Sequence, residues 1–394
     1  MISVSIGMGK NDDARRAGAD AITQALATLP DKHAQCVVVF GSSLIDQDAL
    51  VAGIKDAAPG IQIAGCSTAG EISSEGLASE GGVVVVAFNS DQLHIGTGFG
   101  THMQWNPRRS GMDLADTMHD AMEGNLSAAI FFANVLSGGM EDALMGLRQQ
   151  VGVPITCIAG GAADNFAFYE TSQYYNDRAF GDAITGVGFS GTFTAASVIK
   201  HGFLPVGVQR RVTKATGNII EEIDGRSAIA LYEEYFGEQY STMLQQGKLT
   251  AFASSYPLGI YHDGAIHSVL RSPLRVDVEK GAIVCGGNVS VGSGLRLMIS
   301  DKQQAVTTAR DAARELMQKL GGKKPKVVFM FSSSARRKML GHSADREVRA
   351  VQEEVGRDVP LAGFYSYAEC AFSARPDEAV SMHNGSIALF AIAE

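Results

Sequence analysis

The sequence lacks the patterns that mark several common functional classes. Its 394 residues include only five cysteines, none in a CxxC pair, and they contain no HExxH motif and no Gly-x-Ser-x-Gly elbow. These absences argue against a disulfide framework, a structural zinc site, a zinc protease and a serine hydrolase. We therefore expect neither a metal site nor catalytic residues.

Export and membrane signals are also missing. The first residues contain no basic segment followed by a long apolar run. No apolar run elsewhere approaches the roughly 18 residues that span a bilayer. We therefore expect a cytoplasmic protein without a membrane partner.

Positive charge is in short supply. Lysine and arginine total 33 against 42 aspartate and glutamate residues, which gives a net charge of −9. The two basic clusters, at residues 323–326 and 336–338, are short, whereas nucleic-acid binding needs clustered Lys and Arg. We therefore expect no nucleic-acid partner.

What the sequence does contain is one order of elements that occurs three times. Each copy has a preceding amphipathic helix (12–29, 112–122 and 303–320), a strand (37–40, 129–132 and 327–331), a helix (46–54, 139–147 and 347–354), a second strand (61–63, 153–158 and 359–361) and a closing strand (83–88, 184–189 and 383–392). Strands that alternate with helices favour an α/β fold. We predict repeated β-α-β-α-β-β units that form mixed sheets covered by helices, in two halves, with residues 192–296 as their junction.

Two of the copies share a glycine-rich loop after the second strand. In the first and third copies, Gly65 and Gly363 are each followed six residues later by a glutamate, Glu71 or Glu369. We expect the two glycines to occupy matching strand ends. Glycine and hydroxyl residues at a strand end expose backbone N–H groups that can hold an anion, although a tight turn needs the same residues.

Three separated motifs resemble the FIST family of bacterial sensory proteins. They are GCSTAGEI at residues 65–72, VTKATGN at 212–218 with Asp-Gly at 224–225, and PLAGFYSYAE at 360–369 followed by His383 and Asn384. The sequence departs from the family at Ala368, where a glycine is expected, and at Gly385-Ser386, where Gln-Thr is usual. The resemblance spans about residues 35–392 and implies an N-terminal FIST domain over 1–222 and a C-terminal one over 223–394.

The resemblance also implies a function. FIST modules are sensors in signal transduction, with small ligands such as amino acids proposed, and one subgroup resembles nitric-oxide sensors that bind haem and regulate a histidine kinase. No kinase, cyclase or methyl-accepting segment is fused to this sequence. We therefore expect a small-molecule sensor that acts through a separate signalling protein, and a homo-oligomer is compatible with this.

We expect the ligand where the C-terminal motif, the start of the closing strand and an arginine pair converge. If the two strands before these loops are parallel neighbours, their ends face one cleft. Arg336 or Arg337 would bind an anionic group, although a solvated pair at a helix start is an equal alternative. The other candidate ligand-binding residues are Gly363, Tyr365, Tyr367, Glu369, His383 and Asn384, with Cys66, Ser67 and Glu71 from the N-terminal motif.

Two further alternatives remain open from the sequence. A b-type haem needs an axial ligand, for which His201 and His383 are the candidates, but a lone histidine is more often structural. Cys66 could be a reactive thiol and so support an enzyme acting on a small metabolite, or it could simply fill a turn. No acid, base and nucleophile set can be assembled from the sequence, so we expect a binding protein rather than an enzyme.

Overall fold

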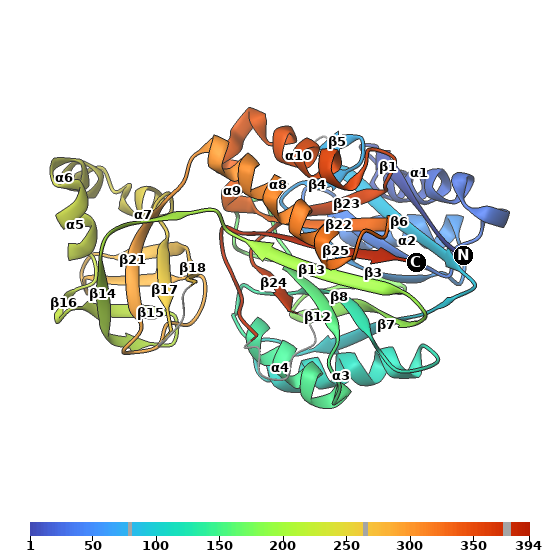
Figure 1. The fold of residues 1–394 in the computed structure, drawn as a ribbon, viewed down its shortest axis with the longest axis horizontal. Helices are drawn as coiled ribbons and strands as arrows, with labels where there is room; N and C mark the ends of the chain where they lie inside the picture. The colour runs from blue at the N-terminus through green and yellow to red at the C-terminus, as the bar shows by residue number, and fades with distance from the viewer. Residues whose placement is uncertain (78–80, 263–266, 373–379) are drawn as a thin grey trace.

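The computed structural model describes residues 1–77, 81–262, 267–372 and 380–394, and it consists of three α/β units and one small domain (Figure 1). The first unit contains β1 (Ile2–Lys10), α1 (Ala14–Thr28), β2 (Cys36–Ser42), α2 (Gln47–Ala57), β3 (Gln62–Thr68) and β6 (Gly82–Ser90). The second contains β7 (Leu93–Thr101), α3 (Pro107–Asp120), β8 (Ala128–Ala133), α4 (Met140–Val151), β9 (Thr156–Gly161) and β12 (Ala183–Gly191). The third contains β13 (Thr194–Lys200), α8 (Lys302–Lys319), β22 (Pro325–Ser333), α9 (Ser334–Leu340), α10 (Asp345–Val355), β23 (Leu361–Ser366) and β25 (Ile387–Ala393).

The three units share one strand order. The sheets run β1-β6-β2-β3, β7-β12-β8-β9 and β13-β25-β22-β23, and in each the last two strands are parallel. Several helices begin where the sequence supplies a cap: Asp13, Asp46 and Asp301 each accept a hydrogen bond from a backbone N–H of the first turn. The predicted α/β class, with repeated units and mixed sheets, is confirmed.

Each unit also gives strands to a neighbouring sheet, which the sequence did not predict. The first unit sends β4 (Glu71–Ser73) and β5 (Gly76–Leu77) to the edge of β23, the second sends β10 (Gln173–Tyr175) and β11 (Arg178–Phe180) to β3, and the third sends β24 (Glu369–Phe372) to β9. The exchange is cyclic, so all three sheets are joined by backbone hydrogen bonds.

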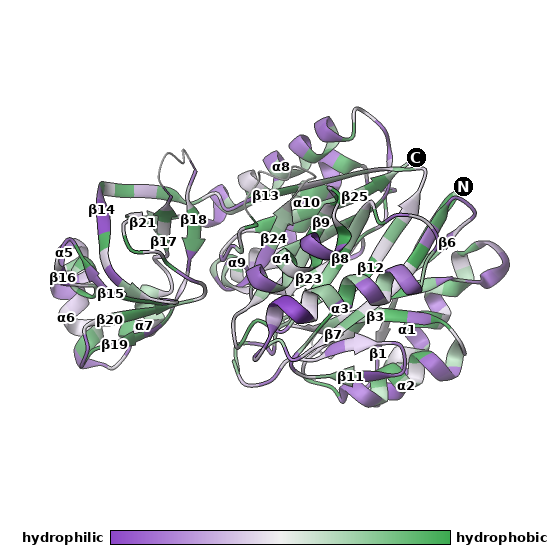
Figure 2. Ribbon diagram, turned by 90° about the horizontal axis from the view of Figure 1, so that it is seen from below, coloured by the Kyte–Doolittle hydropathy of each residue, from purple (hydrophilic) through white to green (hydrophobic). Residues whose placement is uncertain are grey.

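The sheets enclose an aromatic core. Phe40, Phe132 and Phe331 come from the corresponding strands β2, β8 and β22, and their ring centroids lie 5.6, 5.9 and 6.1 Å apart. Phe364 of β23 packs against all three rings. Gly160 occupies the same position in β9 of the second unit, and because it has no side chain it leaves room for the Phe364 ring. Helices cover the outer faces, and Figure 2 shows hydrophobic colouring on the strands and hydrophilic colouring on exposed helix faces.

Gly65 and Gly363 do occupy matching places, as expected, but in mid-strand rather than at strand ends. Gly65 pairs with Val39 of the parallel strand β2, and Gly363 pairs with Met330 of β22. A Cβ on either glycine would overlap the backbone carbonyl of that partner. These two glycines therefore allow the close approach of parallel strands, and they lie within β3 and β23 rather than in the loops that follow.

Residues 204–299 form a small domain inserted between β13 and α8, so the predicted junction is a separate domain with a hydrophobic cluster of its own (Figures 1 and 2). It contains β14 (Leu204–Thr216), β15 (Ile219–Ile223), β16 (Arg226–Ser227), α5 (Ala230–Phe236), α6 (Glu238–Gln245), α7 (Leu249–Ala253), β17 (Leu258–Tyr261), β18 (Val269–Arg271), β19 (Pro273–Asp277), β20 (Ala282–Cys285) and β21 (Gly294–Ile299). The predicted domain boundary between residues 222 and 223 falls inside β15.

Two short 3-10 turns, η1 (Pro30–Lys32) and η2 (Gly341–Ser343), complete the described elements. Among the described residues, no helix has the length and apolar content needed to cross a bilayer.

Candidate functional site

Both of the strand relationships expected around the C-terminal motif are present. β22 and β23 are parallel neighbours, and the closing strand β25 runs antiparallel to β22. The start of the closing segment therefore lies at the same edge as the motif, where the Asn384 side-chain nitrogen donates to the carbonyl oxygen of Tyr367 at 3.4 Å. This edge holds the residues of all three expected segments, and the N-terminal motif joins them.

A small hollow opens at this edge between the N-terminal motif and α9. Its volume is about 20 Å³, and it is lined by Ser42, Leu44, Thr68, Ala69, Gly70, Glu71, Asn165 and Arg337. A cavity of this size holds about one water molecule. A larger ligand therefore requires a side chain or loop to move.

Among the described residues, Arg337 is the one arginine that lines the hollow, and it joins α9 to the N-terminal motif. Its Nη1 donates to the carbonyl oxygen of Ala69, and its guanidinium lies 5.6 Å from the ring centre of Tyr365. Gly70, with φ at +131°, leaves the room that the guanidinium fills, because a Cβ there would meet Nη1. The charge of Arg337 is therefore held against the N-terminal motif.

Glu71 supplies the opposing charge. Its side chain is buried, and its Oε1 accepts a hydrogen bond from the Thr68 hydroxyl at 2.5 Å. Burial raises the pKa of Glu71 to about 7, although the Thr68 bond and the charge of Arg337 act in the opposite direction. The hollow therefore presents a fixed cation beside a carboxyl group that titrates near neutrality.

An aromatic loop, residues 164–170, borders the hollow and was missed by the sequence analysis. Asn165, Phe166 and Phe168 all have positive φ, between 52° and 70°, which is unfavourable for residues other than glycine. The Phe168 ring stacks on Tyr367 with centroids 4.5 Å apart. The signal that the sequence offered there was a pair of phenylalanines shortly after the Ala-Gly-Gly-Ala of the second copy.

Asp164 holds this loop in place. Its carboxylate accepts hydrogen bonds from the Tyr367 hydroxyl and from the backbone N–H groups of Phe168, Tyr169 and Glu170. Burial favours a higher pKa for Asp164, but these bonds outweigh it, and the pKa lies below its usual value. Tyr367 therefore supports the loop beside the hollow and does not itself line the hollow.

Glu369 lies deeper than the hollow. Its two oxygens accept from the hydroxyls of Ser366 and Ser386 at 2.6 and 2.7 Å, and Oε2 also accepts the backbone N–H of Ser386. The residue is fully buried, and burial raises its pKa to about 8 despite these bonds. Glu369 thus ties the exchanged strand to the closing strand.

Arg336 does not reach the hollow, contrary to the expectation that either arginine of the pair would face a ligand. It is fully buried, its Nη2 lies 2.9 Å from Glu347 Oε2, and it also donates to the carbonyl oxygens of Ala305 and His201. Ser332 donates to the other Glu347 oxygen at 2.9 Å. The guanidinium therefore joins α9 to α8 and α10, and of the two arginines Arg337 is the one that lines the hollow.

The remaining N- and C-motif residues are buried in the packing around the hollow. The Ser67 hydroxyl donates to the carbonyl oxygen of Ala163, and the Tyr365 hydroxyl donates to that of Ala344. Cys66 is fully buried in the aromatic core, and burial raises the pKa of its thiol well above its usual value. A buried neutral thiol is a poor nucleophile, which favours the packing interpretation of Cys66.

The two histidines considered for haem lie where the small domain meets the third unit. Nδ1 of His201 accepts the backbone N–H of Phe203, and Nε2 lies 3.5 Å from the Ser268 hydroxyl. The buried Nδ1 of His383 has no hydrogen-bond partner among the described residues. Burial lowers the pKa of His201 to about 4 and that of His383 to about 3, with nearby arginines acting in the same direction. Both rings are therefore neutral near pH 7.

Asn384 links the site to the small domain. Its side-chain nitrogen contacts Tyr367, and its Oδ1 accepts the backbone N–H of Ser272 at 3.1 Å.

Within the described ranges, no group of three or more His, Cys, Asp or Glu side chains is placed to hold a metal ion.

Comparison with known proteins identifies the two halves of the chain. The FIST N domain model matches residues 35–226, and the FIST C domain model matches residues 228–371. An uncharacterised protein of Mycobacterium tuberculosis is 24% identical over 381 residues, which is 93% of this chain and 94% of that protein. An uncharacterised protein of Methanocaldococcus jannaschii is 25% identical over 300 residues, 71% of this chain, and the match spans 57% of the archaeal protein.

Among solved structures, two cyanuric acid hydrolases align over 100% of both chains. One is 10% identical, the other, from A. caulinodans, is 9% identical, and both have a TM-score of 0.37. A likeness at this level carries no argument about activity.

Proposed function

Because this chain belongs to the FIST family, whose domains are sensors in signal transduction, we propose that it is a small-molecule sensor that binds its ligand at the strand-end hollow. One observation carries the proposal: the two FIST domains share the hollow. Thr68, Gly70 and Glu71 come from the FIST N domain, and Arg337 comes from the FIST C domain. A ligand held there contacts both domains at once, as a sensor requires.

The charges of the hollow favour a ligand with an anionic group. The Arg337 guanidinium is the natural partner of a carboxylate, and the carboxyl of Glu71 and the side chain of Asn165 can accept from an amine or a hydroxyl. These groups suit a small amino acid or a related carboxylate. Since the hollow has a volume of only about 20 Å³, binding must displace Arg337 from Ala69 or move the aromatic loop.

We propose that this movement is read by a separate signalling protein, for which a histidine kinase is the leading candidate. The route inside the chain is short, because Asn384 contacts both Tyr367 of the site and Ser272 of the small domain. Rearrangement of the aromatic loop would move Tyr367, and with it Asn384, and would therefore change the hydrogen bond between Asn384 and Ser272 of the small domain.

A haem-based nitric-oxide sensor is the finer form of this proposal, and the structure supports it less. Nδ1 of His383 has no hydrogen-bond partner among the described residues, and its lowered pKa keeps the ring neutral, as an axial ligand must be. However, neither His383 nor His201 lines the strand-end hollow, so a haem held by either ring would lie outside the proposed site. On that ground we favour a colourless ligand. An absorption spectrum of the purified protein with a Soret band would reverse this preference.

The proposal is tested by ligand binding to variants of Arg337. We expect calorimetry with the twenty amino acids and small carboxylates to find a ligand, and we expect Arg337→Ala to weaken its binding at least tenfold, about 1.4 kcal/mol. Arg349→Ala is the matched control, because Arg349 is an exposed arginine paired only with Asp345. Unchanged binding by Arg337→Ala, or equal loss in the control, would refute the site. Steady turnover of a metabolite would instead favour the alternative of an enzyme.

A further inference from the structure

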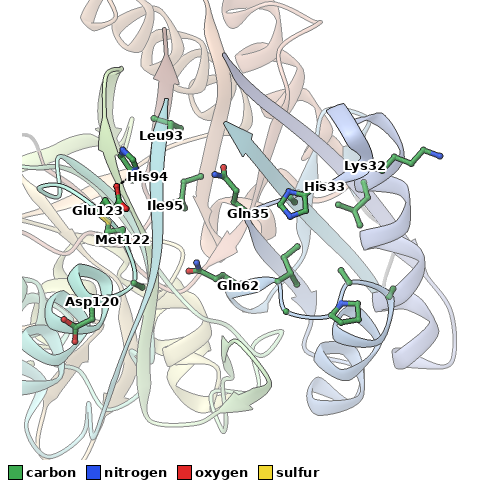
Figure 3. A pocket seen from close by; sticks show the side chains of 18 residues that line it. Lys32, His33, Gln35, Gln62, Leu93, His94, Ile95, Asp120, Met122 and Glu123 are labelled. Atoms are coloured by element: carbon green, nitrogen blue, oxygen red, sulfur yellow. Dashed lines mark ion pairs between the residues drawn. The ribbon is translucent and has the colours of Figure 1, made fainter. Parts of the chain in front are cut away.

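Glu71 differs in burial from the carboxyl groups that line the open depression between the first and second units. In that depression, which is bordered by η1, the starts of β3 and β7 and the end of α3, the side chains of Asp120 and Glu123 are exposed (Figure 3). Glu71 lines the strand-end hollow with only 2% of its surface exposed. Water therefore does little to stabilise its ionised form, and its charge depends on the groups around it.

The titratable and charged groups that surround Glu71 come from three elements. Among the described residues they are Arg337 of α9, Cys66 of β3 and Tyr174 of β10. Burial raises the pKa of the Cys66 thiol and of the Tyr174 phenol well above their usual values, so both groups are neutral. The guanidinium of Arg337 is therefore the charge that acts on Glu71.

The repeat shows that Glu71 is also less completely bonded than its equivalents. Glu71, Gln173 and Glu369 each begin an exchanged strand. Both oxygens of Glu369 and both polar atoms of the Gln173 amide have hydrogen-bond partners within the fold. Glu71 Oε1 accepts from the Thr68 hydroxyl, but within the described part of the chain Oε2 has no hydrogen bond from another residue. Glu71 thus has one oxygen left for a ligand.

The bonds of Thr68 decide where a proton on Glu71 lies. The Thr68 oxygen accepts the backbone N–H of Gly70 at 3.2 Å, and its single hydrogen is donated to Glu71 Oε1. A proton on the carboxyl group therefore lies on Oε2, the oxygen without a partner. Because Glu71 and Arg337 both line the hollow, the neutral acid adds an O–H donor to the N–H donors of the guanidinium.

The two protonation states of Glu71 favour different ligands. With Glu71 neutral, a simple carboxylate meets two kinds of donor and the positive charge of Arg337. With Glu71 ionised, the same carboxylate is repelled by a second negative charge, whereas an ammonium group is attracted. The proton on Glu71 therefore distinguishes a simple carboxylate from an amino acid.

This inference rests on the proposed function, which places the ligand in the strand-end hollow. We infer that Glu71 determines the specificity of the hollow: when a simple carboxylate binds to Arg337, Glu71 takes up one proton and donates it in a hydrogen bond to the ligand. The ligand oxygen replaces the carbonyl oxygen of Ala69 as the acceptor of the Arg337 guanidinium. The proton comes from the solvent, and no other covalent bond forms or breaks.

Calorimetry with acetate at pH 6 and pH 8 tests the coupling. Burial holds the pKa of Glu71 at about 7, so roughly ten times more of the protein has a neutral Glu71 at pH 6 than at pH 8. We expect acetate to bind about tenfold more tightly at pH 6, and to take up about half a proton at pH 7, measured in buffers of different ionisation enthalpy. Glycine, whose ammonium group needs the ionised form, should not share the gain at pH 6. Equal acetate affinity at both pH values, or an equal gain for glycine, would overturn the inference.

A matched pair of variants tests the residue. Glu71→Gln keeps an acceptor for Thr68 and an N–H donor for the ligand, so we expect it to bind acetate equally at both pH values, about as tightly as wild type at pH 6. Glu369→Gln makes the same change at the equivalent position away from the hollow and should keep the tenfold pH dependence. Gln173 shows that the repeat accepts an amide at this position. A tenfold pH dependence that persists in Glu71→Gln would refute the role of Glu71.

Arg337→Ala separates this inference from the proposed function. If Arg337→Ala loses acetate binding while the wild-type affinity is the same at pH 6 and pH 8, the site stands and proton uptake by Glu71 is refuted. Normal acetate binding by Arg337→Ala would refute the site itself. Absence of acetate binding to the wild type at both pH values would overturn the inference.

Discussion

Glu71 and Glu369 hold equivalent positions in two of the three units: each is the first residue of an exchanged strand, and each accepts a hydrogen bond from the hydroxyl three residues before it. In the second unit this position is held by Gln173, whose Oε1 accepts the backbone N–H of Ala183, as Glu369 accepts that of Ser386. The repeat thus places two buried carboxyl groups and one amide where neighbouring sheets are joined.

The first prediction concerns the pH dependence of this arrangement. Burial raises the pKa values of Glu71 and Glu369 from the ordinary 4.5 of a glutamate to about 7 and about 8 in the folded protein. The folded state therefore binds protons more tightly than the unfolded state. The contribution of these two groups to stability is greatest below pH 4.5 and is lost as pH rises toward 8. We expect Glu369→Gln to stabilise the protein at pH 8.5 relative to wild type, by up to a few kcal/mol, and to have little effect near pH 5.

Urea unfolding at the two pH values measures this difference. Gln173 shows that an amide fits this position of the fold. Exposed carboxyl groups titrate in both proteins, so only the difference between variant and wild type is informative. A difference that does not grow with pH would contradict the role of burial.

The second prediction concerns the buried ion pair of Arg336 and Glu347. Both side chains are fully buried, so removing one charge leaves the other without a partner. We expect Glu347→Gln to lower the free energy of unfolding by roughly 3–5 kcal/mol. The exposed pair of Arg15 and Asp56 provides the control, since Asp56→Asn should cost about 1 kcal/mol or less. Equal effects in the two variants would show that Arg336 does not join the helices as described.

A third prediction concerns the close approach of parallel strands. A methyl group at Gly363 would overlap the carbonyl oxygen of Met330, within a rigid sheet that cannot yield. We expect Gly363→Ala to lower the melting temperature strongly or to prevent folding. Gly181→Ala should be tolerated, because no atom lies within 4 Å of the added carbon and φ is not positive there. Thermal denaturation of the two variants gives the comparison.

The fourth prediction concerns the aromatic loop. Tyr367→Phe removes the hydroxyl that donates to Asp164 but keeps the ring that stacks on Phe168. We expect faster amide hydrogen exchange in residues 164–170 and little change in the melting temperature, because the loop is held by few buried contacts. Unchanged exchange would mean that the backbone bonds to Asp164 hold the loop without Tyr367.

Much of the fold followed from local patterns. Runs of β-branched residues predicted β2 and β22, and apolar residues at helical spacing predicted α1, α3 and α8, because these patterns report the burial of one face along a single element. Arg336 and Arg337 show why the residues of the site could not be predicted in the same way. They are adjacent and chemically identical, yet one is buried on Glu347 and the other reaches Ala69, because successive helical residues point in different directions.

The class of fold, the threefold repeat and the family could be predicted from the sequence, because each depends on residue order and short-range spacing. Three relationships became visible in the folded chain: which sheet receives each exchanged strand, that residues 164–170 border the hollow, and that Arg337 of one domain lines the hollow together with Glu71 of the other. These relationships join residues more than a hundred positions apart. They depend on how three separately formed sheets pack around Phe40, Phe132 and Phe331, and no local pattern records that packing.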